Sequence, residues 1–159
     1  YSSFPSMPTL EQELAENVWR YMLDHYLVQP RETQSFYAMG QGYVRFGQQA
    51  RNLFHFLFLS GRVPVQVTQD RLSSLQAPVL AAMRRDPLLA DLPEERLHRI
   101  HRQMWIFTHG LTTMLYTDPL SITPEGVNAL LHEVGMKVIG WELHGFEHPD
   151  DDCPTNEEE

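Results

Sequence analysis

The stretch Pro93–Pro119, PEERLHRIHRQMWIFTHGLTTMLYTDP, decides the fold class because its apolar residues recur every three or four positions. That spacing places them on one face of an α-helix. Pro93 suits the first turn of a helix, and the carboxylates of Glu94 and Glu95 complement the positive end of the helix dipole. Asp118-Pro119 ends the pattern. The predicted apolar stripe consists of Leu97, Ile100, His101, Met104, Phe107, Thr108, Leu111, Met114 and Leu115.

The next segment predicts a second long helix, and this one has two apolar faces. Thr123 can cap it, Pro124 suits its first turn, and Glu125 adds a favourable charge there. One stripe comprises Val127, Leu131, Val134, Val138 and Trp141. The other comprises Leu130, Met136, Ile139 and Leu143. A helix that is apolar on two faces needs two packing partners.

We expect one of these partners to be the chain's own core and the other to be a second copy of the chain. The last two helices would then form a dimeric four-helix bundle across a twofold axis. The predicted dimer interface consists of Leu111, Leu115, Val127, Leu131, Val134, Val138 and Trp141.

Shorter helices are predicted upstream, at about residues 10–28, 32–48, 50–59 and 70–85. Thr9 is expected to cap the first of them, and Gln29-Pro30 to end it. Pro78 predicts a kink or a break in the last of them. Residues 63–67 alternate apolar with polar side chains but include Pro64, so we expect an extended linker there. The chain is thus predicted to be an all-α helical bundle.

The domain organisation is predicted to be simple. The chain has 159 residues, which suits one domain with its own core, here residues 9–145. Residues 1–8 have no initiator methionine and begin on an aromatic turn, so we expect them to be the end of a preceding domain. Residues 146–159 are acidic and lack apolar spacing, which predicts a disordered tail.

Composition excludes several classes of protein. The formal net charge is −9 and the only lysine is Lys137, which argues against nucleic-acid binding by this segment alone. The single cysteine, Cys153, cannot form an intrachain disulfide. The longest apolar run, Leu53–Leu59, is far shorter than the roughly 20 residues of a membrane span. We therefore expect a cytoplasmic protein.

Three motifs, in order along residues 1–145, resemble the tetracycline-repressor (TetR) family of transcriptional regulators. The first is a Tyr-x-x-Phe-x-Ser motif with a following Leu, the second an aromatic-Arg-Phe stretch with a downstream Asn-Leu-Phe run, and the third a Trp followed by His-Gly-Leu. The matching positions are Tyr1, Phe4, Ser6 and Leu10, then Tyr43, Arg45, Phe46 and 52–59, then Trp105, His109, Gly110 and Leu111.

The resemblance implies the ligand-binding and dimerisation domain of a one-component regulator, most often a repressor released by a small apolar or aromatic effector. Operator DNA would be bound by a dimer through an N-terminal helix-turn-helix domain that this chain does not contain, and not by this chain alone. Tyr1 would contact the DNA backbone. Met7 stands where the family usually has a phosphate-binding lysine, so that second contact is not expected here.

The aromatic and methionine residues of the middle helices are candidates for lining an effector pocket. Such side chains suit apolar ligands, although they can equally well fill a closed core. The candidate ligand-binding set is Phe36, Met39, Tyr43, Phe54, Phe58, Met83, Met104, Phe107 and Thr108.

The histidines support weaker alternatives. His98 and His101 share one helix face, where they could hold a metal or haem if His55, His109 or Glu133 supplied a further ligand. His109 is more readily explained by a buried hydrogen bond. We therefore expect no metal and no cofactor, and the absence of phosphate-loop, nucleophile-elbow and paired-carboxylate motifs leads us to expect no enzyme. A dimerisation module without a ligand is the remaining alternative.

Overall fold

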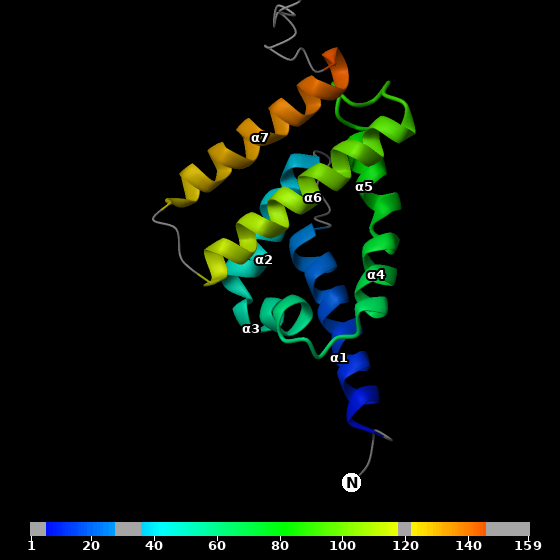
Figure 1. The fold of residues 1–159 in the computed structure, drawn as a ribbon, viewed down its shortest axis with the longest axis vertical. Coiled ribbons are helices and arrows are strands. Elements are labelled where there is room, and N and C mark those ends of the chain that lie inside the picture. The colour runs from blue at the N-terminus through cyan, green and yellow to red at the C-terminus, as the bar shows by residue number, and fades with distance from the viewer. Residues whose placement is uncertain (1–5, 28–35, 118–121, 146–159) are drawn as a thin grey trace, which may run out of the picture.

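The computed structural model describes residues 6–27, 36–117 and 122–145, and within these ranges it contains helices and no strand. The predicted all-α fold is thus confirmed (Figure 1). The contact candidate Tyr1 and the predicted acidic tail, 146–159, lie outside the described residues. No described helix combines the length and the hydropathy that crossing a bilayer requires.

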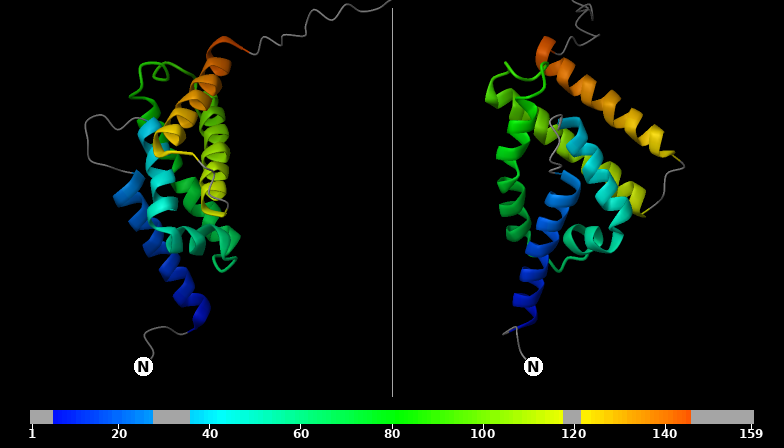
Figure 2. Two further views of the ribbon diagram at one scale, coloured as in Figure 1. Left: turned by 90° about the vertical axis from the view of Figure 1, so that its left-hand side faces the viewer. Right: turned by 180° about the vertical axis from the view of Figure 1, so that it is seen from behind.

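The first helix, α1, spans Met7–Met22 and continues into a π-helical turn, η1, over Leu23–Leu27. Its cap is Ser6, whose side chain accepts a hydrogen bond from the Thr9 N–H, so the prediction of Thr9 as the cap was wrong. Ser6 can cap because Pro8 fits the first helical turn, where the missing N–H is not needed. The N-terminal end of α1 projects beyond the other helices (Figures 1 and 2).

Helix α2, Phe36–Gln49, is the centre of the fold. It packs against η1 on one side and against both long C-terminal helices, α6 and α7, on the other (Figure 2). Two of its glycines make this close packing possible, because a Cβ at Gly42 would meet the Tyr26 carbonyl and one at Gly47 would meet the Thr112 methyl group. The short helix α3, Arg51–Phe54, and the π-helical turn η2, His55–Leu59, follow as predicted for about 50–59.

The region after η2 differs from the prediction. Helix α4 spans Val65–Ser74 and α5 spans Gln76–Met83, so the expected linker over 63–67 was wrong at its second half. The predicted break occurs at Leu75 rather than at Pro78. Pro78 is the third residue of α5, where a missing N–H leaves no intrahelical hydrogen bond unmade.

Helices α6, Glu94–Thr117, and α7, Pro124–His144, match the two long predicted helices and lie side by side (Figure 1). Thr123 caps α7 as predicted. The C-terminal end of α7 is held by two arginines of α6. Arg99 makes a bidentate ion pair with Glu142, in which Nε and Nη2 each donate to a different carboxylate oxygen at 2.9 Å, and Arg96 donates to the Glu142 carbonyl at 2.6 Å.

Much of the predicted dimer interface lies inside this chain's own core. Leu111, Leu115, Val127 and Leu131 form a small buried cluster with Val44 of α2. Val138 is also buried, in the main core, whereas Val134 is half-buried and Trp141 is 52% exposed. Helical periodicity identifies apolar faces but not the neighbour that each face meets, so the sequence could not separate core from interface.

Candidate functional site

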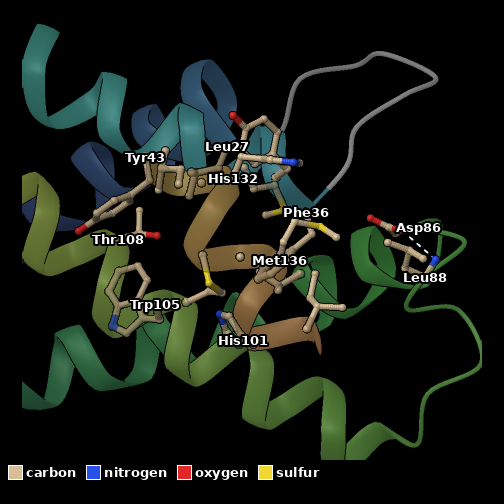
Figure 3. A pocket seen from close by; sticks show the side chains of 18 of the residues that line it. Leu27, Phe36, Tyr43, Asp86, Leu88, His101, Trp105, Thr108, His132 and Met136 are labelled. Atoms are coloured by element: carbon tan, nitrogen blue, oxygen red, sulfur yellow. Dashed lines mark hydrogen bonds between the residues drawn. The ribbon is translucent and has the colours of Figure 1, made fainter. Parts of the chain in front are cut away.

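A cavity of about 310 Å³ lies between α2, α6 and α7, with α5 and the turn after it completing the wall (Figure 3). Its size is at the lower end of the range of small-molecule pockets. The lining is mostly apolar and combines aromatic, aliphatic and methionine side chains with a few polar groups. It consists of Leu27, Phe36, Tyr37, Met39, Gly40, Tyr43, Leu75, Val79, Asp86, Leu88, His101, Met104, Trp105, Thr108, Leu131, His132, Gly135, Met136 and Ile139.

Two glycines help to keep this space open. A Cβ at Gly40 would meet no atom within 4 Å, and one at Gly135 would meet only the Met104 methyl, at 3.7 Å. Gly40 belongs to α2 and Gly135 to α7, so the facing walls of the cavity each lack a side chain at one position. The packing of α2 on α7 therefore leaves a hollow here.

One end of the cavity is bounded by Tyr43, Trp105 and Thr108 (Figure 3). The Tyr43 hydroxyl is hydrogen-bonded to Nδ1 of His109 at 2.8 Å, and the indole of Trp105 stacks on the same imidazole, with ring centroids 5.6 Å apart. Burial raises the pKa of Tyr43 and lowers that of His109. Both groups are therefore neutral near pH 7, and this end of the cavity carries no charge.

A carboxylate of the wall lies away from Tyr43, so the two ends of the cavity differ in polarity. Asp86 and Leu88 lie at the end away from Tyr43, where the Asp86 carboxylate accepts a hydrogen bond from the Leu88 N–H at 3.0 Å (Figure 3). His101 packs edge-on against Phe36, with ring centroids 6.4 Å apart. Burial, and then repulsion by His98, lower the pKa of His101. Asp86 is the only lining residue with a carboxylate, and neither lysine nor arginine lines the cavity within the described part of the chain.

The structure brings five of the nine candidate ligand-binding residues to this cavity, namely Phe36, Met39, Tyr43, Met104 and Thr108. The other four do not line it. Phe54 and Phe58 pack against one another and edge-on against Tyr43 in an aromatic cluster, and Met83 is fully buried in the main core. Phe107 packs against the small cluster on another side of α6.

The residues that sequence reasoning missed fall into two groups. His101 and Trp105 share the α6 face of Met104 and Thr108, so helical spacing alone could have added them. Leu131, His132, Gly135, Met136 and Ile139 come from α7, where the sequence had suggested a face for the dimer or the core. Asp86 and Leu88 belong to a turn, and no periodic signal indicates which way a turn projects.

The alternative of a metal centre gains no support from the described residues, which contain no group of three or more His, Cys, Asp or Glu side chains suited to hold a metal ion. Among the suggested additional ligands, His109 is bound to Tyr43 and Glu133 is paired with Lys137 at 2.6 Å. The expected hydrogen bond of His109 is thus observed.

Comparison with known proteins agrees with this fold. No curated protein and no solved structure matches the chain. Residues 36–134, which run from the start of α2 to the middle of α7 and carry most of the cavity wall, match the family described as tetracyclin repressor-like, C-terminal domain. Because the match covers more than half of the chain, the chain belongs to the TetR-like family, as the regulatory domain of a transcriptional regulator.

Proposed function

We propose that this chain is the effector-sensing and homodimerising domain of a one-component regulator, and that a small, mostly apolar ligand releases the parent protein from its operator. The observation that carries the proposal is the largely apolar cavity of about 310 Å³ between α2, α6 and α7. The aromatic residues next to this cavity pack closely and leave no comparable space. Stability of the fold therefore does not require the cavity, which favours a role in binding.

Contacts from the cavity to α1 support a route for the signal. Leu27, which ends η1, is part of the cavity wall, and the backbone of the preceding Tyr26 packs closely on Gly42 of α2. Elsewhere on α1, Glu16 forms an ion pair with Arg71 of α4 at 2.9 Å. A ligand that shifts α2 or α4 would therefore move α1, whose N-terminal end projects beyond the other helices (Figure 1).

The proposed mechanism is a population shift. The ligand must bind one arrangement of α1 more tightly than the other, because a ligand with equal affinity for both states changes nothing. A full switch requires a difference of about 5.5 kcal/mol between the two binding free energies. Displacement of α1 would change the separation of the two DNA-binding domains in the dimer.

For the dimer, the exposed sides of α6 and α7 are the surface that we propose. Ile106 and Met114 of α6 are 65% and 53% exposed, and Trp141 of α7 is 52% exposed. On α6, Ile106, Gly110 and Met114 recur every four residues. On α7, Leu130 and Val134 follow the same spacing and lead toward Trp141. A second copy, related by a twofold axis, would cover both stripes.

Binding is tested with N-phenylnaphthylamine, an uncharged apolar dye that fluoresces in dry sites. We expect it to bind the purified chain, and Gly40→Leu to abolish binding because the new side chain enters the open space. Gly140→Leu is the matched control, since Gly140 also has open space around it but does not line the cavity. If the dye does not bind, or binds the Gly40→Leu variant equally well, the sensing function is contradicted and the alternative of a dimerisation module without a ligand remains.

The dimer is tested by native mass spectrometry. We expect a dimer, and a folded monomer for Ile106→Glu combined with Met114→Glu, because two charges at exposed positions of α6 would be buried in the interface. Exposed positions on α4 provide the control, for which Gln69→Glu should remain dimeric. A dimer that survives the double substitution would place the interface on another surface.

A further inference from the structure

A second hollow adjoins the cavity on the other side of α6. It is a groove of about 600 Å³ between α6 and the α4–α5 pair. Leu75, His101 and Trp105 line both the groove and the cavity, so these three side chains form a shared partition. Leu75 is also the residue at which α4 ends and α5 begins. A ligand longer than the cavity could therefore extend past this partition into the groove.

The groove differs from the cavity in its chemistry. The described cavity wall contains no lysine or arginine, whereas the charged and titratable lining of the groove consists of Arg99, Arg102, His98, the shared His101 and one carboxylate, that of Glu95. Arg99 is already engaged by the carboxylates of Glu95 and Glu142. Arg102 is exposed and has no hydrogen-bond or ion-pair partner among the described residues. Its guanidinium is available to pair with a carboxylate in a bidentate geometry.

The two imidazoles add to this preference for an anion. They lie one turn apart on α6, and burial, followed by the charge of His98, lowers the pKa of His101. A ligand carboxylate beside them would offset that repulsion, accept a hydrogen bond from His101, and compete with Glu94 for Nε2 of His98, from which the Glu94 oxygen is 3.4 Å away. Gln76 of α5, on the facing wall, offers a further amide donor.

Charges elsewhere would set the orientation of such a ligand. Asp86 lies at the cavity end away from Trp105 and Thr108 and would repel a carboxylate there (Figure 3). The net charge of −9 is concentrated in the tail, since seven of the 21 acidic residues lie in 146–159 and all 12 basic residues lie before it. The remainder of the chain is close to neutral, and the two carboxylates nearest the groove, those of Glu95 and Glu142, are both paired with Arg99.

From this arrangement we propose that the effector is an amphipathic carboxylate, with an apolar chain or ring system in the cavity and its carboxylate in the groove, paired with Arg102 and flanked by His98 and His101. The inference rests on the proposed sensing function and names the class of ligand for that site. Leu75 and Trp105 would contact the ligand where it passes from the apolar part to the polar part.

The test compares three probes with the same apolar chain and different headgroups, namely decanoate, decanol and decyltrimethylammonium. Each is titrated below its micelle concentration into the full chain and followed by isothermal titration calorimetry. We expect decanoate to bind about tenfold or more tightly than decanol, which corresponds to one charge-assisted hydrogen-bonded pair, and the cation to bind most weakly.

Arg102→Gln should reduce the decanoate affinity to that of decanol and leave decanol unchanged. Arg20→Gln is the matched control, because Arg20 is an exposed arginine of α1 that lines neither hollow. Gly40→Leu should weaken decanoate and decanol alike, since both place the apolar chain in the cavity.

Several outcomes would overturn the inference. Equal affinities for the three probes, tighter binding of the cation, or an Arg102→Gln variant that still prefers decanoate would each exclude a carboxylate site in the groove. In those cases binding that remains sensitive to Gly40→Leu would leave the sensing function intact. If no probe binds and N-phenylnaphthylamine also fails to bind, both the inference and the sensing function fail.

Discussion

Two neighbouring aromatic regions of this protein contain similar residues and have opposite packing. In the first, Phe54 and Phe58 pack against Tyr43 and Phe46 packs against Phe54, with Phe46 and Phe54 fully buried and ring centroids 5.2–6.3 Å apart. In the second, Phe36 and Trp105 surround an open cavity. Tyr43 belongs to both regions, since it contacts the packed rings and also lines the cavity.

The difference arises from glycines on the same helix. At Gly42 and Gly47 the neighbouring atoms occupy the place where a side chain would be, so α2 packs tightly at these points. At Gly40 that place is open space, and Gly135 of α7 faces only a methionine methyl group. Aromatic content therefore does not distinguish a core from a binding site, whereas the surroundings of each glycine do.

The largest expected effect is that of truncating the packed region. Phe54→Ala should cost about 3–5 kcal/mol of unfolding free energy, because it leaves a cavity among fully buried rings. Phe36→Ala should cost clearly less, since Phe36 is only partly buried and borders existing space. Urea denaturation of both variants measures the difference, and equal losses would show that the two regions are packed alike.

A pair of alanine substitutions on α2 tests the role of the glycines directly. Gly42→Ala should destabilise the fold by about 1–3 kcal/mol, because the methyl group would meet the backbone carbonyl of Tyr26. Gly40→Ala should instead stabilise the fold by up to about 1 kcal/mol through its higher helix propensity. Thermal unfolding compares them, and a stabilising Gly42→Ala would contradict the close approach of α2 to η1.

Tyr43→Phe probes the residue that belongs to both regions. Loss of the hydrogen bond to His109 should cost about 1 kcal/mol, while the aromatic packing remains. Chemical denaturation gives the stability change, and a histidine NMR titration gives the pKa of His109. If both the stability and the pKa of His109 were unchanged, this hydrogen bond would contribute nothing to the stability of the fold where the two regions meet.

The smallest effect is expected from pH. Burial lowers the pKa of His109, and burial with repulsion by His98 lowers that of His101, from the ordinary 6.5. The unfolded chain therefore binds protons at a higher pH than the folded one. Stability should be complete above about pH 6.5 and decrease as the pH falls toward the folded values.

Melting temperatures between pH 8 and pH 5 measure this dependence. Both His101→Gln, in the cavity wall, and His109→Gln, in the packed region, should make the decrease in melting temperature with falling pH shallower, because each removes one histidine with a lowered pKa. His25→Gln, at an exposed position of η1 away from both regions, serves as the control. A stability that rises as the pH falls through 6.5 would contradict the direction of both shifts.

Much of the fold was predictable from local pattern. The bounds of α6 and α7 follow from Glu94 and Thr123 at their starts and from apolar spacing within them. The region 63–83 was less predictable, because Pro64 and Pro78 signal interruptions but not their nature. Pro78 fits inside the first turn of α5, and the break falls at Leu75 instead.

The candidate site was predictable in part, for a related reason. Phe36, Met39, Tyr43, Met104 and Thr108 were identified because apolar stripes on neighbouring helices tend to face one another. Phe54 and Met83 carry the same kind of signal but are enclosed on all sides. No local feature distinguishes the two outcomes, since each depends on which helix lies opposite.

The sequence by itself determined the helical class, the ends of the two long helices and the resemblance to TetR-like regulators, because caps, prolines and apolar periods act over a few residues. Only the tertiary structure decided that Leu131 and Val138 face the chain's own interior, that Gly40 and Gly135 border a hollow, and that His101 and Trp105 separate this hollow from a polar groove. These properties depend on the distance and angle between helices far apart in the chain, which the packing of all side chains sets together.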